Sequence, residues 1–229
     1  MPWSGVIKAY RPYLDVANVE PVTLLEGGTP LIPAPRLASA LGLPYCDLRV
    51  KYEGLNPTGS FKDRGMTAAM TQALADGARS VICASTGNHG QSVAMACHMH
   101  GVRCRIVVPV DANPDKISAI RALGADVQEH GRDFDDAREF VEAVSAREGW
   151  RYVHNANEPH LISGVATYAI EVFEERPDLD YIFVPIGGGS GAAGCAIVRT
   201  AIGSSAKVIG VQAARADAFA QSWRGPIRV

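Results

Sequence analysis

Hydrophobic residues fall along the chain into short apolar runs that alternate with stretches of helical spacing. The short runs are typical of buried strands, and the helical spacing is that of helices with one buried face. Strands and helices that alternate in this order predict a doubly wound α/β fold with parallel sheets. The predicted strands are 80–84, 105–108, 126–130, 152–153, 181–186 and 207–211. The predicted helices between them are 91–100, 115–123, 135–148, 162–175 and 192–202.

The loop after the first predicted strand carries groups suited to binding an anion. Ser85, Thr86, Gly87 and Asn88 form a turn of small residues, and a helical pattern begins near His89. Ligands of doubly wound folds bind beyond the carboxyl ends of the strands, where this turn lies. Backbone N–H groups, two hydroxyls and an amide at the start of a helix predict a site for an anion such as a substrate carboxylate.

A glycine-rich turn follows the strand predicted at 181–186. It consists of Gly187, Gly188, Gly189, Ser190 and Gly191. A turn of this kind between a strand and a helix start can cradle a phosphate group. Glycine is also favoured in any tight turn between a strand and a helix, so this signal is weak without others.

A third segment places a lysine between a turn and a helix. Lys62 directly follows Gly59, Ser60 and Phe61, and helical spacing continues to Ala73. The helix dipole disfavours a positive charge at this point, which lowers the cost of the neutral amine that a Schiff base needs. A lone lysine is more often a surface residue. Combined with an anion turn and a phosphate cradle, it suggests pyridoxal phosphate (PLP), which has an aldehyde, a phosphate and amino-acid substrates.

The order and the residue patterns of these segments resemble those of the fold-type II PLP enzymes, the tryptophan synthase β family. Within it, the nearest groups are the threonine synthases and the threonine/serine dehydratases. The segment from Asn56 to Met66 is the most specific motif, and the resemblance extends from Gly5 to about Val211. It implies two doubly wound α/β domains, a small one of residues 77–155 and a large PLP-binding one of residues 1–76 and 156–229. It also implies a homodimer.

The large domain is expected to be incomplete. Residues 207–211 resemble one of its central strands, and the family usually continues well beyond that point. The part that normally contacts the pyridine nitrogen of the cofactor would then be missing, and apolar surface would be exposed. A PLP-binding fragment without activity is therefore one alternative for this chain.

The resemblance also implies a role for each motif residue. Lys62 would hold the cofactor and act as the base at the substrate Cα, while Phe61 would pack against the cofactor ring and Asn88 would bind its hydroxyl. The residues expected to bind the substrate carboxylate are Ser85, Thr86, Asn88 and His89. The residues expected to hold the cofactor phosphate are Gly187, Gly188, Gly189, Ser190 and Gly191.

The motifs divide between the two nearest groups. Residues 25–31 and 51–66 resemble the threonine synthases, whereas residues 87–91 and the glycine-rich turn resemble the dehydratases. A threonine synthase must hold the phosphate of O-phosphohomoserine, which calls for cationic and hydroxyl donors. The resemblance places Ala156 and Leu161 where that group has Ser and Arg.

We therefore favour a lyase of the threonine/serine dehydratase type, which eliminates a β-hydroxyl and releases a 2-oxo acid and ammonia. Threonine synthase is the alternative, in particular if Arg151 or His160 supplies the missing charge.

Composition narrows the setting of this activity. The 22 Lys and Arg residues nearly balance the 24 Asp and Glu residues, so nothing favours a nucleic-acid or membrane partner. No apolar run approaches the ~20 residues of a membrane span, and the amino terminus lacks a signal-peptide pattern. The five cysteines have no metal-ligand spacing and indicate reduced thiols. These features predict a cytoplasmic enzyme without a metal site.

Overall fold

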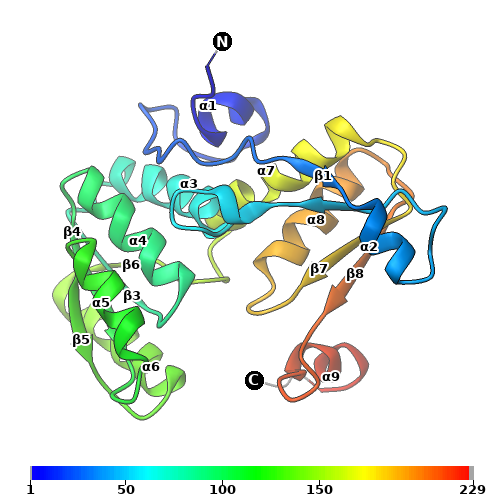
Figure 1. The fold of residues 1–229 in the computed structure, drawn as a ribbon. Helices are drawn as coiled ribbons and strands as arrows, with labels where there is room; N and C mark the ends of the chain where they lie inside the picture. Colours follow the sequence, from blue (N-terminus) through cyan, green and yellow to red (C-terminus); the bar gives the residue numbers. More distant parts are fainter. Residues whose placement is uncertain (1, 227–229) are drawn as a thin grey trace.

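The computed structural model describes residues 2–226, which form three sheets flanked by helices (Figure 1). The ends of the predicted large domain, residues 1 and 227–229, lie outside the described residues. The strands are β1 Leu31–Pro33, β2 Arg49–Lys51, β3 Ser80–Ala84, β4 Arg103–Val108, β5 Asp126–Glu129, β6 Arg151–Tyr152, β7 Tyr181–Pro185 and β8 Lys207–Val211. The α-helices are α1 Val6–Tyr10, α2 Pro35–Ala40, α3 Lys62–Ala75, α4 Asn88–Met99, α5 Pro114–Ala122, α6 Phe134–Glu148, α7 Pro159–Glu175, α8 Ser190–Ala201 and α9 Ala218–Arg224. Short 3₁₀ helices are η1 Arg11–Tyr13 and η2 Glu53–Leu55.

The α/β class and the parallel sheets predicted from the sequence are confirmed. Each strand and helix expected between residues 80 and 211 is present, with ends that shift by a turn or less. The antiparallel pair β1–β2 was not predicted. Its strands are too short to show an alternating pattern, and β1 ends in a proline, which is unusual in a strand interior.

The four-stranded sheet has the order β5-β4-β3-β6, and all its pairs are parallel. Successive side chains of a strand point to opposite faces, so β3 serves two cores. Val81 and Cys83 pack with α4 and α5, whereas Ile82 and Ala84 pack with α6. Helices therefore cover both faces of this sheet (Figure 1). The sheet lies within the range predicted for the small domain.

Helix α3 is packed unusually closely against α7, and this contact fixes the helix that begins with Lys62. A Cβ added at Gly65 would lie 2.7 Å from the backbone oxygen of Leu161. A Cβ added at Gly164 would lie 2.3 Å from the backbone oxygen of Arg64. Glycine is therefore required at both positions because the two helix backbones meet there.

Gly164→Ala is expected to destabilise the fold although alanine is the better helix former. The added methyl group collides with a backbone atom, and overpacking of this kind costs roughly 1–3 kcal/mol. Urea unfolding measures the difference in unfolding free energy. The exposed Ala196 on α8, changed to glycine, gives the propensity effect alone, about 1 kcal/mol. A Gly164→Ala chain as stable as the wild type would contradict the close contact.

The pair β7–β8 is parallel and has α8 on one face. Its other face exposes apolar side chains, among them Phe183 at 65% and Val211 at 49%. Parallel strands are usually covered on both faces, so this uncovered face departs from the common pattern. Helix α9 lies beyond the end of β8 (Figure 1).

Within residues 2–226, no helix combines the length and the apolar character that crossing a bilayer demands.

Candidate functional site

The lysine motif and the glycine-rich turn meet at the amine of Lys62. Lys62 is the first residue of α3, and its Nζ donates a hydrogen bond to Ser190 Oγ at 3.1 Å. Ser190 is buried and is the first residue of α8. Two predicted elements that are 128 residues apart in sequence are therefore in direct contact.

A second acceptor holds the same amine. Lys62 Nζ donates to the backbone oxygen of Asn155 at 2.8 Å, in the turn between β6 and α7. Burial lowers the pKa of Lys62 to about 8. A substantial fraction of this amine is therefore neutral near that pH, as a nucleophilic amine must be.

Aromatic side chains line the same place. The centroid of the Phe61 ring lies 5.0 Å from Lys62 Nζ, and the Tyr168 ring meets Phe61 edge-on at 6.3 Å. The Tyr168 hydroxyl donates to the backbone oxygen of Gly191 at 2.7 Å, and Cys195 Sγ donates to that hydroxyl at 2.9 Å. Tyr168 thus joins α7 to the glycine-rich turn. Sequence reasoning missed it, because an aromatic residue at helical spacing is read as core.

The glycine-rich turn has the shape of an anion cradle. Gly189 adopts a left-handed backbone with φ of 94° and caps α8. A Cβ added at Gly188 would come within 2.8 Å of the Ala156 side chain, whereas Gly187 faces open space. The free N–H groups at the start of α8 and the Ser190 hydroxyl can all donate to a phosphate.

Ser85 organises the second predicted loop. Its Oγ accepts hydrogen bonds from the backbone N–H groups of Gly87 at 3.2 Å and Gly90 at 3.0 Å. The turn is thereby closed at the start of α4, with Thr86 half-buried and Asn88 exposed. N–H groups at such a helix start favour a carboxylate. The roles predicted for Ser85, Thr86 and Asn88 in binding substrate and cofactor stay predictions.

His89 has a structural partner. Its Nε2 lies 3.0 Å from the backbone oxygen of Val153, and a carbonyl only accepts, so Nε2 carries the proton. Burial lowers the pKa of His89 to about 3, which keeps the ring neutral. Among the described residues, His89 Nδ1 has no hydrogen-bond partner. The ring ties α4 to the end of β6, and its predicted contact with a substrate carboxylate stays a prediction.

Arg151 and His160, the two cationic candidates for a substrate phosphate, already have partners. Arg151 Nη2 forms an ion pair with Glu158 at 2.8 Å, and its Nη1 donates to the Tyr152 backbone oxygen. His160 Nδ1 lies 2.6 Å from the backbone oxygen of Asp15. Neither side chain is directed to Lys62 by these contacts.

A buried ion network fixes the lysine motif to α7. Arg64 is fully buried and donates to Glu53 at 2.7 and 2.9 Å and to Glu171 at 2.6 and 2.7 Å. Lys51 also donates to Glu171, at 2.5 Å. Asp63 accepts two hydrogen bonds from Thr58, at 2.7 Å from its N–H and 2.6 Å from its hydroxyl. The residues on either side of Lys62 in the motif thus hold its backbone in place.

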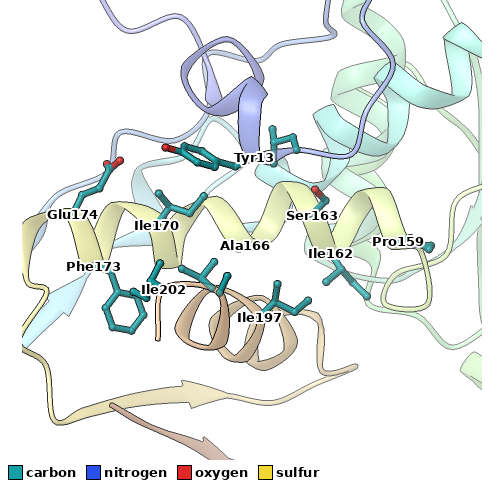
Figure 2. Close-up of a pocket in the computed structure, with 13 residues that line it drawn as sticks. Tyr13, Pro159, Ile162, Ser163, Ala166, Ile170, Phe173, Glu174, Ile197 and Ile202 are labelled. Carbon is teal, nitrogen blue, oxygen red and sulfur yellow. The ribbon is translucent and has the colours of Figure 1, made fainter. Parts of the chain in front are cut away.

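A separate hollow of about 670 Å³ lies between α7, α8 and η1 (Figure 2). Ile162 and Ile170 of α7 and Ile197 and Ile202 of α8 line it, with Tyr13 at one side. None of the predicted site residues belongs to its lining. The candidate site is therefore distinct from this apolar hollow.

The residues around Lys62 fit PLP. They supply an amine for the aldehyde, a helix start with a hydroxyl for the phosphate, and an aromatic ring next to the amine. Across residues 2–226, His, Cys, Asp and Glu side chains form no cluster that could hold a metal ion.

Comparison with known proteins agrees with this fit. A family model described as "Pyridoxal-phosphate dependent enzyme" matches residues 22–228. The chain is 42% identical over 192 residues to a threonine synthase of Synechocystis sp., which covers 81% of this chain and 49% of that protein. It is 38% identical over 167 residues to an L-threonine ammonia-lyase of Thermotoga maritima, covering 72% of this chain and 42% of that protein. The chain thus spans about half the length of the curated relatives it matches.

Solved structures give the same picture. Threonine deaminase isoform 2 from Solanum lycopersicum aligns with a TM-score of 0.78 and 33% identity, over 86% of this chain and 53% of that one. Maize serine racemase aligns with a TM-score of 0.80 and 28% identity, over 88% of this chain and 61% of that one.

Proposed function

The chain belongs to the pyridoxal-phosphate-dependent enzyme family, and we propose that it is a lyase of the threonine/serine dehydratase type with Lys62 as the cofactor lysine. The reaction eliminates the β-hydroxyl of a hydroxy amino acid and yields a 2-oxo acid and ammonia. PLP, when bound, supplies an electron sink for the bond broken at Cα.

The residues of the chain divide the remaining work. The start of α8, with Gly187 to Gly191, binds the phosphate, and the turn after β3 binds the substrate carboxylate. Lys62 serves as the base at Cα, for which burial provides a neutral amine near neutral pH. Asn155 and Ser190 hold that amine in position. Phe61 packs beside the amine and helps to exclude water.

The contacts of Arg151 support the hypothesis of a dehydratase. A substrate with a dianionic phosphate needs free cationic donors, and Arg151 is committed to Glu158 at 2.8 Å. His160 is engaged with Asp15, and Leu161 is buried. A hydroxy amino acid without a phosphate makes no such demand, so these contacts support it as the substrate.

Threonine synthase is the second candidate. It is supported by the 42% identity to threonine synthases of Synechocystis sp. and Mycobacterium leprae, compared with 38% to the threonine ammonia-lyase. Release of the Arg151 side chain from Glu158 would provide the cation that this substrate needs.

Product analysis separates the two reactions. The chain loaded with PLP is incubated with threonine, serine or O-phosphohomoserine, and 2-oxo acid, ammonia and inorganic phosphate are measured. We expect 2-oxo acid and ammonia in equal amounts from threonine or serine, and none with a Lys62→Arg variant. Rapid phosphate release with threonine as product would instead establish threonine synthase. A chain that binds PLP and turns over none of the three would be a non-catalytic binder.

The assembly and the location are part of the proposal. We expect a homodimer, supported by the family resemblance. We expect it in the cytoplasm, supported by five free cysteines that indicate reduced thiols. Sedimentation of the purified chain measures the first, and a monomer at micromolar concentration would contradict it.

A further inference from the structure

The turn between β6 and α7, residues 154–157, forms a wall of the site but contains none of the residues predicted to bind the cofactor or the substrate carboxylate. His154 Nδ1 accepts hydrogen bonds from the backbone N–H of Ala156 at 3.0 Å and of Asn157 at 2.8 Å. Because two N–H donors approach this ring nitrogen, Nδ1 is unprotonated and the ring proton is on Nε2. The side chain closes the turn as Asn or Asp does in an Asx turn, where a side-chain acceptor binds backbone N–H groups further along the chain.

Asn155 is enclosed by this turn, and its backbone oxygen accepts the hydrogen bond from Lys62 Nζ at 2.8 Å. The turn also touches the glycine-rich loop, since a Cβ added at Gly188 would lie 2.8 Å from the Ala156 Cβ. Closing a turn restricts the backbone dihedrals of the residues inside it. The direction of the Asn155 carbonyl, and with it the place of the Lys62 amine, therefore depends on the acceptor at position 154.

We propose that His154 is a positioning residue for Lys62, which holds the Asn155 carbonyl against the amine by accepting two backbone hydrogen bonds at Nδ1. This inference concerns the lysine of the proposed function. The contacts that carry it belong to the chain itself and require no cofactor.

Protonation of His154 would undo this arrangement. A proton on Nδ1 would face the two N–H groups that already point at it, so the turn would open. The charged and titratable groups that face His154 are Lys62 of α3, His89 of α4, Arg138 and Glu142 of α6, and Glu158 at the start of α7. The Tyr152 ring is packed at 5.6 Å.

Burial is the main cause that lowers the pKa of His154 from its ordinary value; Arg138 and Lys62 add to it, and Glu142 and Glu158 oppose it. The folded pKa therefore lies below the ~6.5 of an unfolded histidine. The turn is intact when the pH is above the pKa of an unfolded histidine. It weakens as the pH falls through the lower pKa that His154 has in the folded chain.

The test measures the pKa of the Lys62 amine in the chain without cofactor, by competitive acetylation and peptide mass spectrometry. The exposed Lys116 serves as internal reference. His154→Phe keeps an aromatic ring but has no acceptor, so the turn opens and water reaches Lys62. We expect its pKa to rise by at least about one unit, a tenfold change in neutral amine, toward the ~10.4 of an exposed lysine.

The matched variants distinguish the acceptor from the ring. His154→Asn restores an acceptor for the same N–H groups and is expected to keep the wild-type pKa of Lys62. His100→Phe, at an exposed position, is expected to change nothing. A folded His154→Phe chain with the wild-type pKa of Lys62, or a His154→Asn chain that behaves like it, would overturn the proposal.

If His154→Phe does not fold, two measurements on the wild-type chain test the proposal instead. NMR follows the imidazole of His154 during a pH titration, and hydrogen exchange follows the amides of Ala156 and Asn157. The exchange rates of these amides, corrected for the intrinsic pH dependence of exchange, must increase as the His154 ring becomes protonated. Rates that do not change over this titration would contradict the proposal. Neither measurement involves PLP or a substrate, so a failure here is distinct from a failure of the proposed lyase activity.

Discussion

Lys62→Arg is expected to abolish the covalent attachment of PLP while leaving the chain folded. Arginine keeps a positive charge beside Asn155 and Ser190, but its guanidinium stays protonated and does not react with the aldehyde. The effect is complete loss, since Lys62 is the amine that the glycine-rich loop and the Phe61 ring surround. The visible absorption of the mixture with PLP, and the mass gained after borohydride reduction, measure it.

The control for this prediction is Lys116→Arg, an exposed position that should retain full attachment. A pH series adds a second check. Because the pKa of Lys62 is about 8, the neutral amine available for attachment falls about tenfold for each pH unit well below that value. Undiminished attachment in Lys62→Arg would contradict the assignment of the cofactor lysine.

Arg64→Met is expected to lower the free energy of unfolding by about 3–5 kcal/mol, the usual cost of removing one partner from a buried ion network. Arg64 is fully buried, and its loss leaves Glu53 without the cation that it contacts at 2.7 Å. Glu171 keeps the cation of Lys51 and the hydrogen bond from the Gly28 backbone N–H. Methionine fills a similar volume, so the lower free energy of unfolding results mainly from the lost charge and not from a cavity. Urea unfolding monitored by circular dichroism measures it.

Arg121→Met is the matched control. Arg121 is exposed and lies 3.5 Å from Glu129, and exposed pairs contribute roughly 0–1 kcal/mol. An Arg64→Met chain no less stable than the Arg121→Met chain would show that the network does not hold the lysine motif in place.

The parts of the fold that the sequence predicts are those where burial dictates the residues. Strand β3 is buried along its whole length and is apolar from Val81 to Ala84, so its type and position can be predicted from the sequence. β1 and β2 are three residues each, and their pairing of Leu31 with Lys51 depends on tertiary contacts. Segments this short carry no period by which they could be recognised.

The candidate site divides in the same way. The lysine motif and the glycine-rich turn can each be recognised in the sequence because each is a characteristic run of consecutive residues. Their contact through Ser190, and the second contact through Asn155, depend on how distant elements pack. His154 and Tyr168 act through backbone atoms of the turn and the loop, which any sequence possesses, so no motif identifies them.

The role of Lys62 as the cofactor lysine is tested by a peptide map of the wild-type chain after incubation with PLP and borohydride reduction. We expect one cofactor mass on the tryptic peptide of residues 52–64, because cleavage after a modified Lys62 is blocked while Lys51 and Arg64 remain cleavable. A cofactor mass on another lysine, such as Lys51 or Lys207, or none on a folded chain, would contradict it.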